Sequence, residues 1–335
     1  MPTNSEATAD RVRQYLHRTG ASPGSLTQTL PGDASTRQYI RVTSPEGSSR
    51  ILLVHTGPFD PDVLPFLNVA DLLERMRVRV PTVVRCEGDL GIVELEDLGD
   101  ITLHAFLDEA TPTERTACYA DAVAIIDRMQ HRGRDLASPR YVPYGLAFDV
   151  DKLAWELEFF ADYFLIAERH AHLSSDERGA LRAEFLALST ELAAEPRIFC
   201  HRDYHSRNLM LCDRELCVID FQDARMGPDT YDLVSLLRDC YVDQPAGFVG
   251  QMIDEYLRLA EPVDSVDFRR RFDIMSVQRH LKALGTFGYQ ATVAGNTRYR
   301  EDVPRTLSYI RDVFDAEARF DPLRRLLSTH VTELG

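Results

Sequence analysis

An aspartate, an asparagine and a second aspartate follow one another at a spacing that suits phosphoryl transfer. Asn208 lies five residues after Asp203, and Asp220 lies twelve residues after Asn208. Such chemistry needs a carboxylate that orients a hydroxyl group and accepts its proton, and hard oxygen ligands that hold Mg²⁺. The pattern predicts Asp203 as the catalytic residue, and Asn208 and Asp220 as metal ligands. The alternative is that all three are solvated loop residues between core strands.

Short apolar segments flank these three residues and are typical of buried strands. Residues 197–200 lead into the loop, residues 209–212 leave it, and residues 216–219 end directly before Asp220. The polar residues 213–215 indicate a turn between the second and third segments. The sequence therefore predicts that the loop, a hairpin and the second aspartate lie at neighbouring strand ends.

The segment from His201 to Gln222 resembles the catalytic core of the protein-kinase-like superfamily, and more closely the aminoglycoside phosphotransferase family. A protein kinase would carry a long activation segment here, whereas this chain is expected to enter a helix near residue 228 or 229. The resemblance implies a two-lobed α+β fold, with a small antiparallel β lobe over residues 1–97 and a mostly helical lobe over residues 98–335. It also implies ATP and Mg²⁺ as cofactors, and a supporting role for Asp232 behind the catalytic loop.

Composition restricts the class of protein. The chain has 335 residues, is 44% hydrophobic and carries a formal net charge of −15. This charge argues against nucleic-acid and anionic-membrane partners, which need clustered basic residues, and it permits a cationic substrate. The sequence shows no apolar run of membrane-spanning length and no signal core, which predicts a cytoplasmic protein. The six cysteines are predicted to be reduced core residues, and no oligomeric state follows from the sequence.

The first lobe is expected to bind the nucleotide. Strands are predicted at residues 26–30, 36–43, 50–55, 83–86 and 91–96, with helices at 9–19 and 63–77. The turn before the second strand contains Gly32 and Ser35, and its backbone amides would cover the phosphates; an ordinary β-turn is the alternative. In the kinase-like arrangement, backbone groups near Glu94 to Glu96 would pair with adenine.

The resemblance implies a lysine on the third strand of this lobe, but the chain has only two lysines, Lys152 and Lys282. An arginine could take its place, because a guanidinium group binds phosphate through two hydrogen bonds and stays charged. The candidates are Arg37, Arg41 and Arg50, with Arg41 favoured over Arg37. The alternative is that these arginines are solvated on the outer face of a strand.

The second lobe is predicted to be mostly helical. Thr111 and Glu114 form one capping box, and Ser174 and Glu177 form another. Helices are expected at residues 111–132, 151–169, 174–195, 229–240, 245–260, 265–288 and 303–315. The aromatic residues of the 151–169 helix are expected to pack in the core, with sugar stacking as the alternative.

Further stretches resemble one subgroup, the bacterial anomeric sugar kinases that phosphorylate N-acetylmuramate and N-acetylglucosamine at the C1 hydroxyl during peptidoglycan recycling in the cell wall. They cover residues 32–41, 95–100, 201–210, 220–239 and 278–285. The resemblance implies a small amino-sugar substrate, and the polar side chains expected to contact phosphate or sugar are His205, Arg207, Gln222, Arg225, Gln278, Arg279 and His280. For residues 278–282 the alternative is the polar face of a packed helix.

Two other functions stay open. An aminoglycoside or amino-alcohol O-phosphotransferase would fit the acidic charge of the chain. A non-catalytic nucleotide-binding regulator would account for the missing strand lysine, but the presence of Asp203, Asn208 and Asp220 together argues against it.

Overall fold

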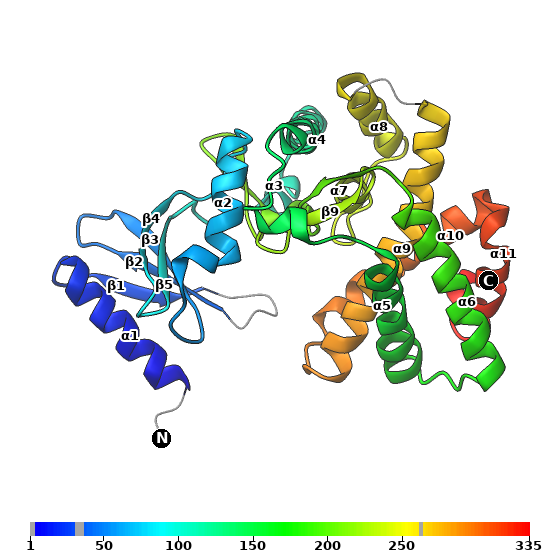
Figure 1. Cartoon of the computed structure of the whole chain (residues 1–335), viewed down its shortest axis with the longest axis horizontal. Coiled ribbons are helices and arrows are strands. Elements are labelled where there is room, and N and C mark those ends of the chain that lie inside the picture. Colours follow the sequence, from blue (N-terminus) through cyan, green and yellow to red (C-terminus); the bar gives the residue numbers. More distant parts are fainter. Residues whose placement is uncertain (1–3, 31–36, 261–263) are drawn as a thin grey trace. The chain divides into compact units, whose positions relative to one another are not determined.

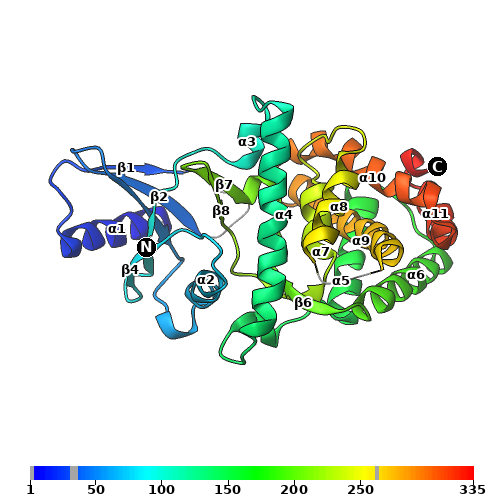
Figure 2. The same cartoon turned by 90° about the horizontal axis from the view of Figure 1, so that it is seen from above.

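The computed structural model of the chain describes residues 4–30, 37–260 and 264–335. The chain forms two compact units, of which unit 1 comprises residues 1–101 and 210–222, and unit 2 comprises residues 102–209 and 223–335. The elements of both units are labelled in Figures 1 and 2. Among the described residues, no helix has both the length and the apolar character needed to cross a bilayer.

Unit 1 is built on an antiparallel sheet with the strand order β1-β2-β3-β5-β4. Its elements are α1 (Asn4–Thr19), β1 (Leu26–Thr29), β2 (Gln38–Thr43), β3 (Ser49–Val54), α2 (Pro65–Arg75), β4 (Val83–Glu87) and β5 (Ile92–Glu96). Four consecutive residues of β3, Ile51 to Val54, are buried. Because successive side chains of a strand point to opposite faces, this run shows that both faces of the sheet are covered.

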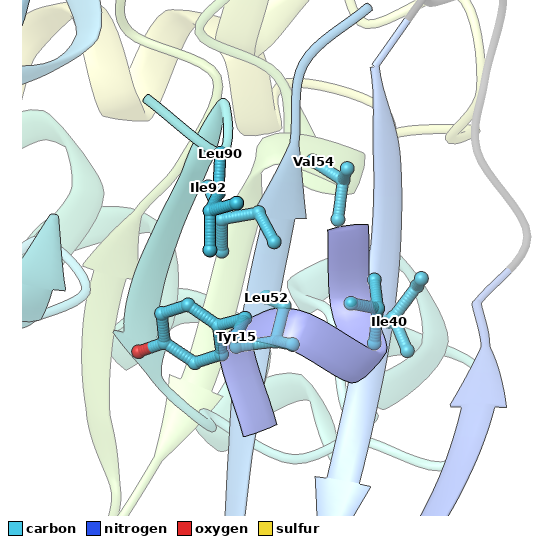
Figure 3. Close-up of a cluster of buried hydrophobic side chains, with 7 residues drawn as sticks. Tyr15, Ile40, Leu52, Val54, Leu90 and Ile92 are labelled. Atoms are coloured by element: carbon cyan, nitrogen blue, oxygen red, sulfur yellow. The ribbon is translucent and has the colours of Figure 1, made fainter. Parts of the chain in front are cut away.

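One face of this sheet packs against α1 (Figure 3). Tyr15 of α1 lies over Ile40, Leu52 and Ile92 in a single buried cluster that also contains Val12. Its hydroxyl donates a hydrogen bond to the carboxylate of Glu94 on β5. The N-terminal helix that the sequence predicts is therefore part of the core of unit 1.

The predicted hairpin is present as β7 (Leu209–Cys212) and β8 (Glu215–Val218). Its two turn residues, Asp213 and Arg214, have φ values of 53° and 68°, the conformation that a tight hairpin turn requires. Met210 and Cys217 form a buried cluster with Leu98. The hairpin thus belongs to unit 1, whereas the sequence analysis had assigned it to the second lobe and ended the first lobe at residue 97.

Unit 2 is mainly helical. Its helices are α3 (Leu103–Leu107), α4 (Pro112–Asp135), α5 (Val150–Phe160), α6 (Ser175–Ala193), α7 (Tyr231–Leu237), α8 (Phe248–Leu259), α9 (Ser265–Thr292), α10 (Val303–Ala316) and α11 (Asp321–Ser328). Both predicted capping boxes are confirmed, with Thr111 and Glu114 starting α4 and Ser174 and Glu177 starting α6. The short helices α3 and α11 were not predicted.

A strand that the sequence analysis missed lies just before α7. β9 (Arg225–Pro228) pairs antiparallel with β6 (Arg197–Cys200), the strand that leads into the catalytic loop. The helix expected from residue 228 or 229 therefore begins only at Tyr231. The pairing holds the residues on either side of the catalytic segment together.

Helix α9 packs against α5, against the π-helical segment Ala161–Glu168 that continues α5, and against α7 and α10. Two glycines of α9 make this close approach possible. A Cβ atom on Gly285 would lie 2.8 Å from Phe160 Cα, and one on Gly288 would collide with the Tyr163 carbonyl group. The glycines thus set the depth at which α9 lies, and α9 carries residues of the site described below.

Replacement of Gly288 by alanine is expected to lower the free energy of unfolding by about 2–3 kcal/mol, the cost of forcing extra volume into a packed interior. The matched control is Gly179→Ala on α6, where no atom lies within 4 Å of the new Cβ. That change is expected to stabilise the protein by up to about 1 kcal/mol, because alanine favours a helix more than glycine does. Urea unfolding of both variants measures the difference, and equal effects would contradict the packing described for α9.

Candidate active site

The loop that carries Asp203 is held from behind by Asp232 of α7. Asp232 Oδ2 accepts a hydrogen bond from the His201 amide at 2.6 Å, and Oδ1 accepts one from the Arg202 amide at 2.9 Å. Arg202 has φ +85°, a conformation that a residue with a side chain rarely adopts without support. The predicted supporting role of Asp232 is therefore confirmed.

Positive charges surround the carboxylate of Asp203. Lys282 Nζ lies 3.2 Å from Oδ1, Arg279 Nη2 lies 3.8 Å from the same oxygen, and Arg202 Nε lies 3.8 Å from Oδ2. Burial alone would raise the pKa of Asp203, but these cations, Lys282 foremost, outweigh it and hold the pKa well below its usual range. Asp203 is therefore ionised at neutral pH and able to accept a hydrogen bond from a hydroxyl group.

The rest of the loop is fixed by three further hydrogen bonds. Asn208 Nδ2 donates one to the Asp203 carbonyl group at 2.9 Å, which directs the amide nitrogen into the loop. Asp239 Oδ2 accepts hydrogen bonds from Ser206 N at 2.9 Å and Ser206 Oγ at 2.5 Å. The position of Asn208 is thus set by local bonding in unit 2.

His205 and Arg207 both contact Tyr241, which follows α7. The His205 ring meets the Tyr241 ring edge to face at 5.3 Å, and the Arg207 guanidinium lies 3.7 Å from the centre of the same ring. Burial lowers the pKa of His205, with Asp239 and Asp203 opposing the shift. Tyr241 thereby orients two side chains that the sequence analysis assigned to the substrate.

Three predicted substrate residues lie on α9 and have partners within unit 2. Arg279 Nε donates to Ser235 Oγ at 2.8 Å. Gln278 is fully buried and donates to Glu156 at 3.0 Å. The buried His280 ring lies 2.8 Å from the Arg238 carbonyl oxygen, and burial lowers its pKa to about 4.

For Gln278 and His280, the structure shows the packed polar helix face that the sequence analysis held as the alternative, and their contact with substrate stays a prediction. Arg279, by contrast, reaches the Asp203 carboxylate. The contact of Arg225 with substrate also stays a prediction. Its guanidinium lies 5.2 Å from the centre of the Phe148 ring, and its Nε donates to the Asp223 carbonyl group.

A cavity of about 20 Å³ in unit 2 lies next to His205, Arg279 and His280. Its lining residues are His205, Ser235, Arg238, Asp239, Cys240, Tyr241, Arg279, His280 and Ala283. This volume suits a water molecule and is too small for a sugar ring. Arg238 Nη1 and His205 Nδ1, which are buried and have no hydrogen-bond partner in the structure, are suitable partners for such a water.

In unit 1, Asp220 ends the segment that follows β8. Its φ of +62° lies in the left-handed region, which aspartate tolerates better than most residues. Gln222 Nε2 donates to Asp220 Oδ1 at 2.8 Å, and Arg37 Nη2 lies 3.7 Å from the same oxygen. A carboxylate is a ligand that Mg²⁺ prefers, and its neighbours orient it without adding negative charge.

The arginine favoured by the sequence analysis is bound elsewhere. Arg41 makes two hydrogen bonds to Asp97, at 2.6 and 2.9 Å, an ion pair with Asp100 at 2.8 Å, and a hydrogen bond to the Gly99 carbonyl group. It therefore holds together the segment that follows β5. Of the candidate arginines, Arg37 lies beside Asp220, and the phosphate-binding role of Arg37 and Arg41 stays a prediction.

The remaining nucleotide-binding predictions concern the turn with Gly32 and Ser35 and the segment from Glu94 to Glu96. Gly32 and Ser35 lie outside the described residues. Glu96 accepts hydrogen bonds from Thr82 through its side chain and donates one to the Thr82 carbonyl group through its backbone amide. Any adenine contact in this segment would therefore use backbone groups other than the Glu96 amide.

Sequence reasoning left several contributors to the site without a role. Lys282 and Asp239 lie within stretches that carry the family resemblance, but their partners Asp203 and Ser206 are 79 and 33 residues away. The count of two lysines could have drawn attention to Lys282, because a chain with two lysines has few ways to place an ammonium group.

Comparisons with known proteins place the chain in a family. Residues 27–268 match the phosphotransferase enzyme family. An N-acetylmuramate/N-acetylglucosamine kinase from Neisseria meningitidis serogroup B is 35% identical, with 88% of this chain and 87% of that protein aligned. The chain belongs to the phosphotransferase enzyme family. This phosphotransferase transfers a phosphoryl group to a hydroxyl acceptor.

A further curated relative and two solved structures also resemble this phosphotransferase. A Pseudomonas aeruginosa protein of the same name is 31% identical over 89% of this chain and 86% of its own. Among solved structures, an ADP-bound aminoglycoside phosphotransferase matches with a TM-score of 0.61 at 14% identity, covering 91% of this chain and 99% of the other. An amicoumacin kinase in complex with AMP-PNP and Ca²⁺ matches with a TM-score of 0.62 at 16% identity, covering 94% and 96%. These likenesses confirm the predicted kinase-like fold.

Proposed function

We propose that this phosphotransferase is an amino-sugar kinase that uses Mg·ATP to phosphorylate the anomeric C1 hydroxyl of N-acetylmuramate, N-acetylglucosamine or both. The observation that carries the proposal is the alignment of at least 88% of the chain with three proteins named for these two sugars, at 30–35% identity. The reaction would serve peptidoglycan recycling, and we place it in the cytoplasm, where ATP is available.

Asp203 is suited to the reaction. An anomeric hydroxyl group is more acidic than an ordinary alcohol, so an ionised carboxylate with a low pKa suffices to accept its proton. Asp203 takes the proton from the C1 hydroxyl as the oxygen bonds to the γ-phosphorus and ADP leaves with the electrons of the broken P–O bond. Most of the catalysis then comes from positioning and charge stabilisation.

Two side chains of the protein offer donor atoms that suit a divalent cation bound to a triphosphate. Asp220 offers a carboxylate and Asn208 an amide oxygen, and both are hard ligands. We propose these two residues as the protein ligands of Mg²⁺, which supplies charge neutralisation at the phosphates. Gln222 supports this role by donating to the Asp220 carboxylate.

The charges around Asp203 help to choose between substrates. Among the described residues, Lys282, Arg279 and Arg202 form ion pairs with its carboxylate within 4 Å. A cationic aminoglycoside or amino alcohol would be repelled by this surplus of positive charge, whereas a neutral sugar or a sugar with a carboxylate would not. The cluster therefore favours the amino-sugar reading, despite the acidic net charge of the chain.

Replacement of Arg37 by alanine is expected to raise KM for ATP about tenfold, the effect of losing one hydrogen bond to a charged group. Arg41→Ala is expected instead to lower the melting temperature, because it leaves the buried Asp97 carboxylate without its main partner. Steady-state kinetics with ATP as the varied substrate, together with thermal melts, separates the two effects. A larger rise in KM for Arg41→Ala than for Arg37→Ala would return the phosphate-binding role to Arg41.

The proposed function is tested by ADP release from Mg·ATP with N-acetylmuramate, N-acetylglucosamine, kanamycin or choline added singly. Release that depends on either sugar is the expected result. Release with kanamycin or choline alone would keep the phosphotransferase assignment and reject the amino-sugar substrate. A reaction without an acceptor measures background hydrolysis and serves as the control.

A further inference from the structure

Lys282 is a partly buried cation whose partner is the carboxylate of Asp203. It lies on α9, its side chain is 15% exposed, and Nζ donates a hydrogen bond to Asp203 Oδ1 at 3.2 Å. The other two cations near Asp203 lie 3.8 Å away, beyond hydrogen-bond distance. Among the cations that the structure pairs with Asp203, Lys282 is thus the one that contacts it directly.

The path of α9 explains how a residue 79 positions away reaches the loop. Arg279 lies one turn earlier on the same side of the helix, and its guanidinium is fixed by Ser235 Oγ. Gly285, one turn later, allows α9 to lie against the Phe160 backbone. Contacts one turn before and one turn after Lys282 therefore fix the position and rotation of α9, and so place Lys282 beside Asp203.

A buried ammonium group is costly unless it is paired. A purely structural cation at this place would be easier to replace by an apolar side chain, of the kind that fills most buried positions of α9. A second carboxylate, Glu156 of α5, acts on Lys282 only through its charge and bonds to Gln278 instead. The contact with Asp203 is what accounts for a lysine here.

We propose that Lys282 is a positioning residue for phosphoryl transfer, whose ammonium group holds Asp203 Oδ1 and leaves Oδ2 to accept the hydrogen bond of the substrate hydroxyl. The proposal rests on the proposed kinase function and names a residue that sets the geometry of its base. A lysine suits this place because its compact ammonium group can bind one carboxylate oxygen without covering the second.

The pair also fixes how the site responds to pH. The charged groups that act on Asp203 include Lys282 and Arg279 of α9 and Arg202 and His205 of its own loop, which lower its pKa, and Asp232 of α7, whose negative charge opposes them. Because the pKa of Asp203 is depressed, Asp203 stays ionised as pH falls through the normal range for an aspartate. Burial lowers the pKa of Lys282, with Asp203 opposing the shift. The ion pair is therefore lost when Lys282 gives up its proton as the pH rises.

The experiment compares Lys282→Met and Lys282→Arg with the parent enzyme. Lys282→Met is expected to lower kcat about 100-fold, the lower range for losing a well-placed proton acceptor, with KM for ATP within about twofold because nucleotide binding does not depend on this contact. In the pH profile of kcat for this variant, the acid limb should move to higher pH, since Asp203 has lost its nearest cation. Lys282→Arg should recover at least about tenfold of this loss and extend the alkaline limb, because a guanidinium group stays protonated.

The matched control is Arg300→Met, which removes an exposed cation that pairs with Glu168 outside the site. It is expected to leave kcat and both pH limbs unchanged. Normal kcat in Lys282→Met would overturn the proposal. So would equal losses in the methionine and arginine variants with unmoved pH limbs, which would indicate a role in packing only.

A readout without turnover separates this proposal from the proposed function. The carbon-13 carboxyl signal of Asp203, assigned by its loss in Asp203→Asn, is titrated in the parent protein and in Lys282→Met. The pKa of Asp203 is expected to rise in the variant. An unchanged pKa would reject the pairing even if the enzyme were active, and a raised pKa would support it even if every sugar failed as a substrate.

Discussion

Asparagine in place of Asp203 is expected to lower kcat by about 10³-fold while Mg·ATP still binds with nearly normal affinity. The amide keeps the shape of the carboxylate but cannot take the proton of the substrate hydroxyl. It also leaves the positive charges of Lys282 and Arg279 without their counter-ion. Single-turnover kinetics and calorimetric nucleotide binding measure the two quantities separately.

The control for this variant is Asp213→Asn, the same chemical change on the exposed hairpin turn between β7 and β8. Asparagine tolerates the left-handed backbone there, so both activity and stability should be retained. Near-normal kcat in Asp203→Asn, or an equal loss in the control, would remove Asp203 from the chemistry.

The second large effect is expected at Asp220. Asp220→Asn should lower kcat/KM for Mg·ATP at least about 100-fold, because a neutral amide holds a divalent cation more weakly than a carboxylate does. Asparagine accepts the φ of +62°, so the fold should persist. Nucleotide affinity is measured with and without Mg²⁺.

In the parent enzyme, Mg²⁺ should strengthen nucleotide binding, and in Asp220→Asn this gain should be largely lost. Higher Mg²⁺ concentrations should restore part of the activity. A variant that keeps the full Mg²⁺ dependence of the parent would show that the cation has other ligands.

Features with local causes were predictable from the sequence. The capping boxes at Thr111 and Ser174 place helix starts because the bonds that cap a helix lie within four residues of one another. The β7–β8 hairpin was predicted for the same reason, since its strands are joined by a two-residue turn. The two-lobed kinase-like fold then followed from the family resemblance.

Features that depend on distant partners were not predictable. β9 forms because Arg225–Pro228 pairs with β6, and its short sequence ends in a proline that resembles a helix start. The π-helical continuation of α5 packs against α9, which no periodicity of residues 151–169 discloses.

The site divides along the same line. Asp203, Asn208 and Asp220 could be proposed as site residues from the sequence because they share one short stretch of chain. The choice between Arg37 and Arg41 could not be made in this way, because it depends on Asp97 and Asp220, which lie 56 and 183 residues from these arginines. Tertiary packing alone brings such partners together.

We propose that the phosphoryl group is transferred to the C1 hydroxyl of an amino sugar. Phosphorus-31 NMR of the product formed from N-acetylmuramate and Mg·ATP tests this transfer most directly. The expected result is a single sugar phosphate whose phosphorus couples to the anomeric proton, and no such product with Asp203→Asn. A phosphate coupled to another position of the ring, or a product that forms equally well with Asp203→Asn, would contradict it.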